Sequence, residues 1–425
     1  MSYFPKWKLK TSGIVAPDER LPATQTAAMG VQHVVAMFGS TILAPLLMGF
    51  DPNVAILMSG IGTLIFFAIV GGRVPSYLGS SFAFIGVVIA ATGYSAGSGL
   101  NMNIGPALGG ILVCGLLYVL IGLIVISTGV NWIEKLMPPV VSGAIVAVIG
   151  LNLAPTAVRG VGTGTFNACI AIITMLSVGL VAVYTRGMIQ KLLILIGILI
   201  SYFIYFLLTN VLGLGPAINF ELIANAPWFG VPHFSSPTFD FNAILLIAPV
   251  VIILVGENLG HVKAVTAMTG KNLDPYMGRA FLGDGLATMF SSCFGGTGVT
   301  TYGENIGVMA ATRVYSTLVF VVAAVFAIVL GFSPKFGAII QTIPQPLLGG
   351  VSIVVFGLIA VAGARIWVVN HVDFSENRNL IVAAVTLILG GGDFTLLIGD
   401  FTLGGIGTAT FGAILLNAIM SHDKH

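Results

Sequence analysis

Three acidic residues, Glu257, Asp284 and Glu304, lie inside long apolar stretches of this sequence. A carboxylate at the centre of a membrane-spanning helix costs about 2.5–3.5 kcal/mol, so such groups usually serve substrate binding or ion coupling. Glu257 and His261 are four residues apart and share one helix face, and a carboxyl with an imidazole can exchange a proton near neutral pH. We therefore expect these four groups to couple protons. The alternative is a structural polar network that clamps helices, and for Asp284 both readings are equally open.

The stretch from Thr300 to Arg313 changes its pattern halfway along. Its first part, up to Tyr302, is β-branched and aromatic, which is typical of an extended segment. After Gly303 the apolar residues recur at helical spacing, so Glu304 stands at a helix N-terminus. Inside a membrane, extended backbone must be satisfied by neighbouring protein, a substrate or an ion. Such broken helices mark the binding sites of many transporters.

Aromatic side chains accompany these positions. Phe82 and Tyr302 stand beside two helix breaks at matching places in the sequence. They could be core aromatics, but their symmetric placement favours stacking on a flat ligand. His33 lies in the first apolar segment, where a packed, hydrogen-bonded histidine is more common than a substrate ligand.

Composition indicates that all these groups belong to a polytopic membrane protein. Of 425 residues, 57% are hydrophobic and only 8% are charged, and the mean hydropathy is +1.04. Soluble domains have about 25% charged residues. With about 17 to 25 apolar residues per span, the sequence predicts an all-α fold with fourteen membrane segments, two of them broken strand-helix segments (80–93 and 298–313). The others cover 25–48, 52–71, 106–128, 139–158, 166–184, 190–213, 242–262, 280–295, 314–333, 346–366, 378–395 and 402–421.

The basic residues predict the orientation. With both termini inside, every lysine and arginine except Arg159 and Lys335 faces the cytoplasm, as the positive-inside rule requires. A multi-pass protein of the cell (inner) membrane is therefore expected. The first 25 residues have no apolar core, so no cleavable signal peptide is predicted.

Similar residues recur in the same order in the two halves of the chain. Ala36–Ser40 aligns with Glu257–His261, and Ser80–Ala83 aligns with Thr300–Gly303 at nearly the same spacing. An odd number of spans per half turns the second half upside down, so the pattern predicts a 7+7 inverted repeat. The two broken segments should then meet near the membrane midplane.

Signatures of other function classes are missing from the sequence. It has no HExxH, P-loop or CxxC motif, and its three cysteines lie in apolar segments without metal-ligand spacing. No enzyme activity, metal or cofactor is therefore expected. The formal net charge of +2 gives no reason to expect a nucleic acid partner.

The residues around Glu304 resemble those of a known family. Glu304-Asn305-Ile306-Gly307 followed by Thr312-Arg313 is similar to the signature of the nucleobase-ascorbate transporters. Glu257–His261, Gln32-His33 and the run Pro75–Phe84 strengthen the resemblance. It extends from residue 24 to residue 416, and bacterial uracil permeases are the most similar members. It implies a proton symporter that forms a homodimer in the lipid bilayer.

The resemblance also implies a domain organisation. After a cytoplasmic tail at 1–24, a core domain would comprise residues 25–128 and 242–333, and a gate domain would comprise 139–213 and 346–421. The core would hold the substrate and move against the gate.

Individual roles follow from the same resemblance. Glu257 would accept hydrogen bonds from the ring N–H groups of uracil. The other groups expected around the ring are the backbone of Phe82, Gly303 and Glu304 and the side chains of His261 and Tyr302. Support is expected from His33, Ser40 and Asn305.

The sequence thus predicts a secondary active transporter that imports uracil, or other pyrimidine nucleobases, with a proton by alternating access. A purine (xanthine or urate) permease of the same fold and a channel using the same polar midplane are the alternatives. Asp284 stands where several uracil carriers have an amide, and Ser40 where alanine is common. Either difference could change proton coupling or substrate range.

Overall fold

The computed structural model describes residues 3–11, 13–94, 99–398 and 401–421. Lys424, which was expected on the cytoplasmic side, lies outside them.

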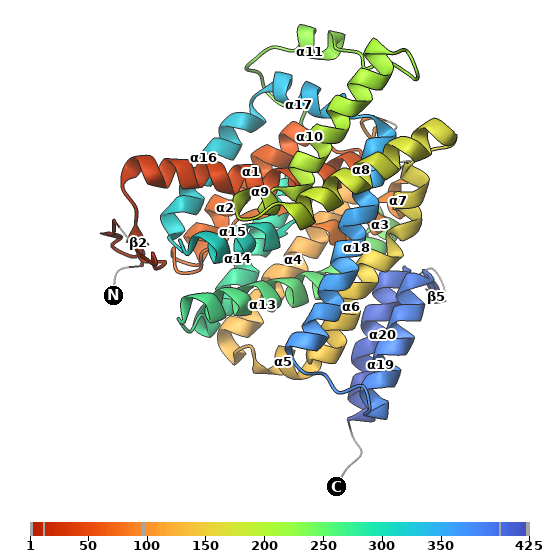
Figure 1. Cartoon of the computed structure of the whole chain (residues 1–425). Helices are drawn as coiled ribbons and strands as arrows, with labels where there is room; N and C mark the ends of the chain where they lie inside the picture. Colours follow the sequence, from red (N-terminus) through yellow and green to blue (C-terminus); the bar gives the residue numbers. More distant parts are fainter. Residues whose placement is uncertain (1–2, 12, 95–98, 399–400, 422–425) are drawn as a thin grey trace.

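The chain forms a bundle in which long helices cross steeply. In Figure 1, α1 (Ala23–Met48) and α13 (Val250–Thr269) run from side to side, whereas α6 (Pro139–Asn152) and α18 (Gln345–Val369) run from top to bottom.

The remaining elements follow in chain order. The first half contains β1 (Lys8–Leu9), β2 (Glu19–Arg20), α2 (Pro52–Ile69), β3 (Leu78–Ser80), the 3-10 turn η1 (Phe82–Phe84), α3 (Ile85–Thr92), α4 (Gly105–Thr128), α5 (Asn131–Leu136), α7 (Ala154–Gly160), α8 (Thr165–Tyr184), α9 (Met188–Lys191), α10 (Leu193–Phe206) and the π-helical η2 (Leu207–Val211). The second half contains α11 (Glu221–Asn225), α12 (Phe241–Ile247), η3 (Asp274–Tyr276), α14 (Met277–Cys293), β4 (Val299–Thr301), α15 (Gly303–Thr312), α16 (Thr317–Gly331), α17 (Pro334–Gln341), α19 (Asn377–Gly391), β5 (Leu396–Ile398), β6 (Phe401–Leu403) and α20 (Gly405–Met420).

Most expected segments coincide with helices to within a few residues, and three of the differences have an identifiable structural reason. The segment expected to end at 262 continues to Thr269, where Gly270 closes the helix in the left-handed conformation (φ +65°). The segment expected from 314 begins as a helix only at Thr317, because residues before it pair with the N-terminal region. The last segment, expected from 402, begins as strand β6.

By length and apolar composition, fewer than fourteen of the described helices could each span a membrane. Among the described residues, eight are long and apolar enough, or nine if α16 and α17, bent by 80° at their junction, count as one. The others, including α3, α19 and α20, are too short for a full span. The amphipathic turn of α17 was not predicted.

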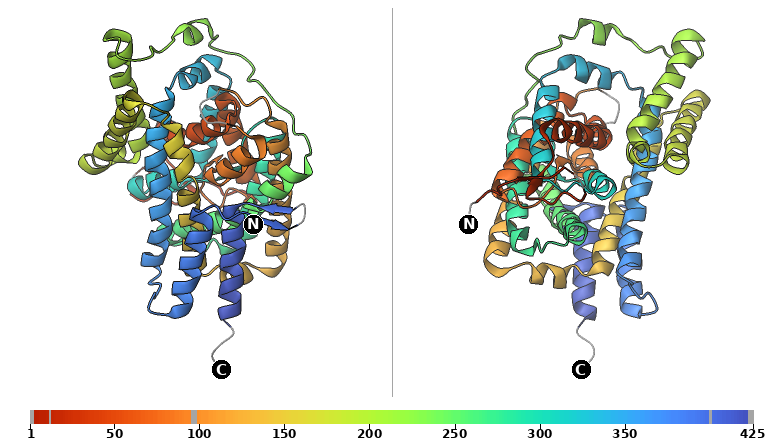
Figure 2. Two further views of the ribbon diagram at one scale, coloured as in Figure 1. Left: turned by 90° about the vertical axis from the view of Figure 1, so that its right-hand side faces the viewer. Right: turned by 60° about the vertical axis from the view of Figure 1, so that its left-hand side comes forward.

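The packing of the helices reproduces an inverted repeat. Helix α4 packs on α14 and α2 packs on α16; likewise α8 packs on α18, and α19 on α6. Each pair consists of one helix from each half, and the second pair is the first with the roles of the two halves exchanged. Figure 2 shows α8 and α10 on the outer side of α18, and α19 and α20 beside α6.

The two broken segments meet through their strands. Strands β3 and β4 pair antiparallel, with Gly79 opposite Thr300. The pairing continues past the strands, because the Ser81 N–H donates to Gly298 O (2.9 Å). Extended backbone in the middle of the bundle thereby finds its partners within the protein. Gly79 is required here, since a Cβ would lie 2.4 Å from the Tyr302 ring.

Glycines bring α4 and α14 into backbone contact. A Cβ at Gly122 would lie 2.6 Å from the backbone nitrogen of Leu282, and a Cβ at Gly285 would lie 2.7 Å from that of Val119. Small residues at such a seam allow helices to approach closely in the absence of a hydrophobic driving force between them. The seam fixes α14 behind strand β4.

Candidate functional site

A cavity of about 440 Å³ lies where the two broken segments and α13 face α6, α10 and α18. Its polar lining comes from one wall and consists of Ser80, Ser81, Glu257, His261, Tyr302 and Glu304. The opposite wall is apolar and consists of Val146, Ile149, Ile194, Val355, Leu358, Ile359, Ala362 and Ile366. A small flat molecule with polar edges matches such a cavity, because one wall can bind its edge while the other covers its face.

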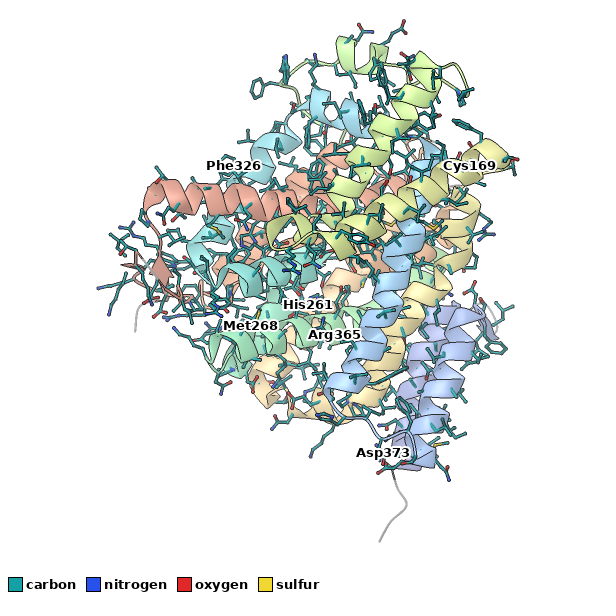
Figure 3. The ribbon with its side chains drawn as sticks, viewed as in Figure 1. Cys169, His261, Met268, Phe326, Arg365 and Asp373 are labelled. Atoms are coloured by element: carbon teal, nitrogen blue, oxygen red, sulfur yellow. The ribbon has the colours of Figure 1, made fainter. Side chains whose placement is uncertain are left out.

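Helix α13 presents Glu257 and His261 on one face, as their spacing predicts, and both line the cavity. The Nδ1 of His261 lies 2.9 Å from the Thr301 hydroxyl at the end of β4. Figure 3 shows His261 in the middle of the bundle. The imidazole therefore connects the helix that carries Glu257 to the strand that precedes Glu304.

Helix α15 begins at the cavity without a side-chain cap on its N-terminus. The first N–H groups of a helix have no partner within it, so those around Gly303 and Glu304 are available to a ligand. The Glu304 carboxylate also lines the cavity and accepts a hydrogen bond from the hydroxyl of Ser40 on α1. The glutamate is thus held by a neighbouring helix.

Phe82 and Tyr302 both line the cavity, but they differ in their freedom to move. The Tyr302 ring is buried, and its hydroxyl donates to Ser80 O (2.8 Å) and lies 3.2 Å from Thr41 Oγ1. Phe82 is half-buried and makes an edge contact with Phe356 of α18, with ring centroids 6.3 Å apart. Phe82 can adjust to a ligand, whereas Tyr302 is fixed.

The remaining expected residues lie outside the cavity. Asp284 is fully buried on α14, where its Oδ2 accepts a hydrogen bond of 2.6 Å from the Asn258 side chain. The Asn305 amide donates to both the ring nitrogen (3.0 Å) and the carbonyl oxygen (3.1 Å) of His33. His33 and Asn305 therefore attach α15 to α1 rather than line the cavity.

Sequence reasoning missed Ser81 and the whole apolar wall. The Ser81 hydroxyl caps η1 by accepting the Ala83 N–H (3.3 Å) and interacts with the Glu257 carboxylate. The internal repeat could have indicated Ser81. In the alignment of the two halves Ser81 matches Thr301, and Thr301 is the partner of His261. The apolar wall had no signal, since its residues resemble those of any membrane helix.

Comparison with solved structures identifies the fold. The chain superposes with a TM-score of 0.66 on the overall structure of SLC26A9, covering 94% of this chain and 66% of that chain at 12% identity. It superposes with a TM-score of 0.61 on the transmembrane domain of the cyanobacterial bicarbonate transporter BicA, covering 93% and 97% at 14% identity. The fold is thus the 7+7 inverted-repeat fold of these membrane proteins.

Comparison of sequences defines the family. The pattern of the Xan_ur_permease family, described as "Permease family", matches residues 24–399, and the chain belongs to this family. It is 68% identical over 422 residues to the "Putative pyrimidine permease RutG" of Escherichia coli (strain K12), covering 98% of this chain and 95% of the relative. It is 43% identical over 419 residues to the "Uracil permease" of Paenibacillus larvae subsp. larvae, covering 95% and 96%.

These findings confirm the resemblance stated from the residues around Glu304. The chain is a multi-pass membrane permease, a transport protein and not an enzyme. Among the described residues, no cluster of three or more histidine, cysteine, aspartate or glutamate side chains could hold a metal ion.

Proposed function

We propose that this permease is a secondary active transporter that imports uracil, or a closely related pyrimidine nucleobase, together with a proton. The observation that carries the proposal is the cavity, whose polar groups all come from one wall while the facing wall is apolar. The names of its two relatives, a uracil permease and a pyrimidine permease, support this substrate class.

The chemistry of the cavity matches a uracil ring. Uracil presents alternating N–H donors and carbonyl acceptors on its edge. Glu257 accepts from ring N–H groups, and the backbone N–H groups of Gly303, Glu304 and Phe82 serve the remaining polar positions. Tyr302 and Phe82 flank the ring. His261 completes the site because its other ring nitrogen lies close to Gly303, 3.4 Å from where a Cβ would stand.

Proton coupling is assigned to Glu257, His261 and Glu304, with Asp284 as a fourth group. The first three share one cavity with the substrate, so a proton on one of them changes the charge that the substrate meets. Asp284 is linked to the same helix as Glu257 through Asn258. The Asp284 carboxyl also interacts with Thr300 and Thr301 of β4, and an ionisable group buried at this depth is costly unless it serves a function.

Transport requires the two walls to separate. We assign residues 25–128 and 242–333 to a core that carries the polar wall, and 139–213 and 346–421 to a gate that carries the apolar wall. The proposal treats all fourteen segments as crossing or entering the membrane, with both termini in the cytoplasm. Assembly as a homodimer is part of the proposal on the family resemblance alone.

Uptake of radiolabelled uracil into proteoliposomes tests the function. Accumulation above equilibrium is expected only with an inward proton gradient. Glu257→Gln should abolish uracil binding and uptake, whereas Glu221→Gln, on the exposed helix α11, should transport normally. Uracil uptake that merely equilibrates in the wild type would instead support a channel, and unchanged binding in Glu257→Gln would remove that residue from the site.

A purine permease is the second candidate. According to the family resemblance, members that transport purines tend to have glutamine at the position of Glu304. The glutamate in this chain therefore favours uracil as the substrate. Competition of xanthine with uracil for uptake discriminates the two. Xanthine transport without uracil transport would keep the fold and reject the substrate.

A further inference from the structure

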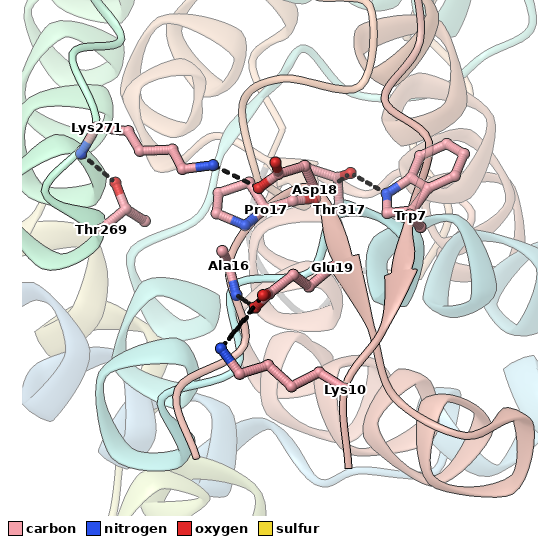
Figure 4. Close-up of polar contacts among 9 residues, drawn as sticks. All are labelled: Trp7, Lys10, Ala16, Pro17, Asp18, Glu19, Thr269, Lys271 and Thr317. Carbon is pink, nitrogen blue, oxygen red and sulfur yellow. Dashed lines mark hydrogen bonds and ion pairs between the residues drawn. The ribbon is translucent and has the colours of Figure 1, made fainter. Parts of the chain in front are cut away.

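The N-terminal region, expected only to be a cytoplasmic tail, folds as a strap across one end of the bundle. We define the strap as the described residues between Tyr3 and Leu21. Its two short strands, β1 and β2, pair in parallel. The Lys10 ammonium lies 2.9 Å from the Glu19 carboxylate, which also accepts the Ala16 N–H (2.8 Å). Figure 4 shows these contacts, which give the strap a defined shape.

The strap pairs with the backbone directly after α15. The Val15 N–H donates to Arg313 O (3.0 Å), and the Tyr315 N–H donates to Val15 O (2.8 Å). Val15 is almost fully buried. Arg313 ends α15 in the left-handed conformation (φ +57°), which a residue other than glycine rarely adopts. The strap thus fixes an unfavourable turn at the end of the helix that begins with Glu304.

A second set of contacts fixes the start of α16. The Thr317 hydroxyl donates to Pro17 O (3.0 Å) and accepts from the Trp7 indole (3.0 Å), and the Thr317 N–H also donates to Pro17 O (3.2 Å). Asp18 forms an ion pair with Lys271, which follows α13. All of these attachments are to the second repeat.

The other end of the strap holds the first repeat. The Tyr3 hydroxyl donates to the carbonyls of Ala68 (2.8 Å) and Ile69 (2.9 Å) at the end of α2. Phe4 stacks on Phe67 of the same helix, with ring centroids 5.5 Å apart. The loop after α2 leads directly into β3. One strap therefore joins the two repeats at the segments adjoining β3 and α15.

We propose that the strap is a positioning element of the transporter: by pairing with residues 313–317 it sets the place of α15, and hence of Gly303 and Glu304, relative to the cavity. Its effect on uptake rests on the proposed function, but its effect on α15 does not. The strap acts through α15 and touches none of the residues that line the cavity.

Hydrogen–deuterium exchange of the purified full chain tests the effect on α15. Val15→Pro removes the N–H that binds Arg313, so exchange in residues 303–312 should rise while exchange in α4 stays unchanged. Thr11→Pro is the matched control, because Thr11 is exposed and follows extended backbone, which tolerates proline. Unchanged exchange in 303–312, with the strap itself exchanging faster, would overturn the proposal.

Thr317 provides a second test should Val15→Pro fail to fold. Thr317→Val removes the hydroxyl, whereas Thr317→Ser keeps it, so exchange in 303–312 should rise only in the valine variant. Arg313→Gly should partly reverse the effect of Val15→Pro, because glycine adopts the left-handed conformation without strain. Equal exchange in the valine and serine variants would contradict the proposal.

Uracil uptake then measures the consequence. The KM of Val15→Pro should rise about five-fold, the size of one lost hydrogen bond, with little change in the maximal rate. If Val15→Pro gives less protein but the purified variant has the wild-type KM, the strap serves only the stability of the fold, and the positioning role is overturned. If the wild-type chain transports no uracil, the proposed function fails, and the exchange data still decide whether the strap positions α15.

Discussion

Tyr302 and Ser80 lie on opposite broken segments, and the Tyr302 hydroxyl donates a hydrogen bond of 2.8 Å to the Ser80 carbonyl. The bond crosses over Gly79, where only a glycine leaves room for the tyrosine ring. It links the residue before α15 to the last residue of β3, outside the regular pairing of β3 and β4. The two helix N-termini that face the cavity are therefore held relative to each other by a side chain.

Tyr302→Phe should loosen this connection. The variant loses the bond to Ser80 and leaves a buried carbonyl oxygen without its partner, so the free energy of unfolding should fall by about 1–3 kcal/mol. Thermal unfolding in one detergent measures the change. Tyr184→Phe, on the exposed face of α8, is the control and should unfold like the wild type. Equal midpoints for the two variants would mean that the Tyr302 bond contributes nothing.

Ser40→Ala should weaken substrate binding. The hydroxyl of Ser40 orients the Glu304 carboxylate, and a hydrogen bond to a charged group contributes about 1.5–3 kcal/mol. We expect the KM for uracil to rise at least about ten-fold. Ser127→Ala is the control, because this exposed hydroxyl binds only within its own helix. A wild-type KM in Ser40→Ala would show that Glu304 needs no support from α1.

Gly122→Ala should destabilise the bundle. Its methyl group would lie 2.6 Å from the Leu282 backbone nitrogen, and such overpacking costs about 1–3 kcal/mol. The matched control is Gly179→Ala on α8, where a Cβ meets nothing within 4 Å. Alanine there favours the helix by up to about 1 kcal/mol, so its unfolding midpoint should stay constant or rise. The order of the two midpoints decides the prediction.

The attachment of the strap should depend on pH at the acidic end. The hydrogen bond from Lys271 lowers the pKa of Asp18 below its ordinary value. A lowered folded-state pKa means that the stabilisation is complete above the unfolded value of about 3.9 and disappears as pH falls through the folded value. Because the pair is exposed, it contributes less than about 1 kcal/mol.

Thermal unfolding from about pH 6 to about pH 3, a range that brackets the pKa of Asp18 in the unfolded chain, measures this dependence. Asp18→Asn should lower the midpoint at pH 6, and the difference from the wild type should shrink as the pH falls below the unfolded pKa of about 3.9. Glu221→Gln should run parallel to the wild type throughout. A difference that is as large at pH 3 as at pH 6 (roughly the two ends of the range) would assign the effect to packing of Asp18 and not to its charge.

Local pattern predicted most of the fold, and backbone pairing accounts for what it missed. The change at Gly303 from β-branched to helical spacing correctly located β4 and α15, because each side chain there obeys a local periodicity. The delayed start of α16 at Thr317 was not predictable, since it depends on backbone pairing with Val15 about three hundred residues away. The strand at the start of the last segment has a local cause instead, because it pairs with β5, its neighbour in the sequence.

The site was predicted as a set of residue types but not as a geometry. Glu257, His261 and Glu304 were recognisable because ionisable groups are costly within apolar segments. Asn305 belongs to the same signature, yet it points to His33. Chemistry therefore indicated which residues matter, and only the packing of α1 against α15 determined which of them reach the cavity.

The division of the cavity into one polar and one apolar wall has a consequence for how such a permease can diversify. Under the proposed function, the groups that bind the ligand and the surfaces that move past it are encoded in different segments, so a change of substrate requires new side chains only on α13 and the two broken segments. The facing helices need to supply only an apolar surface. Their sequences can therefore change while the proposed movement of the two walls is preserved.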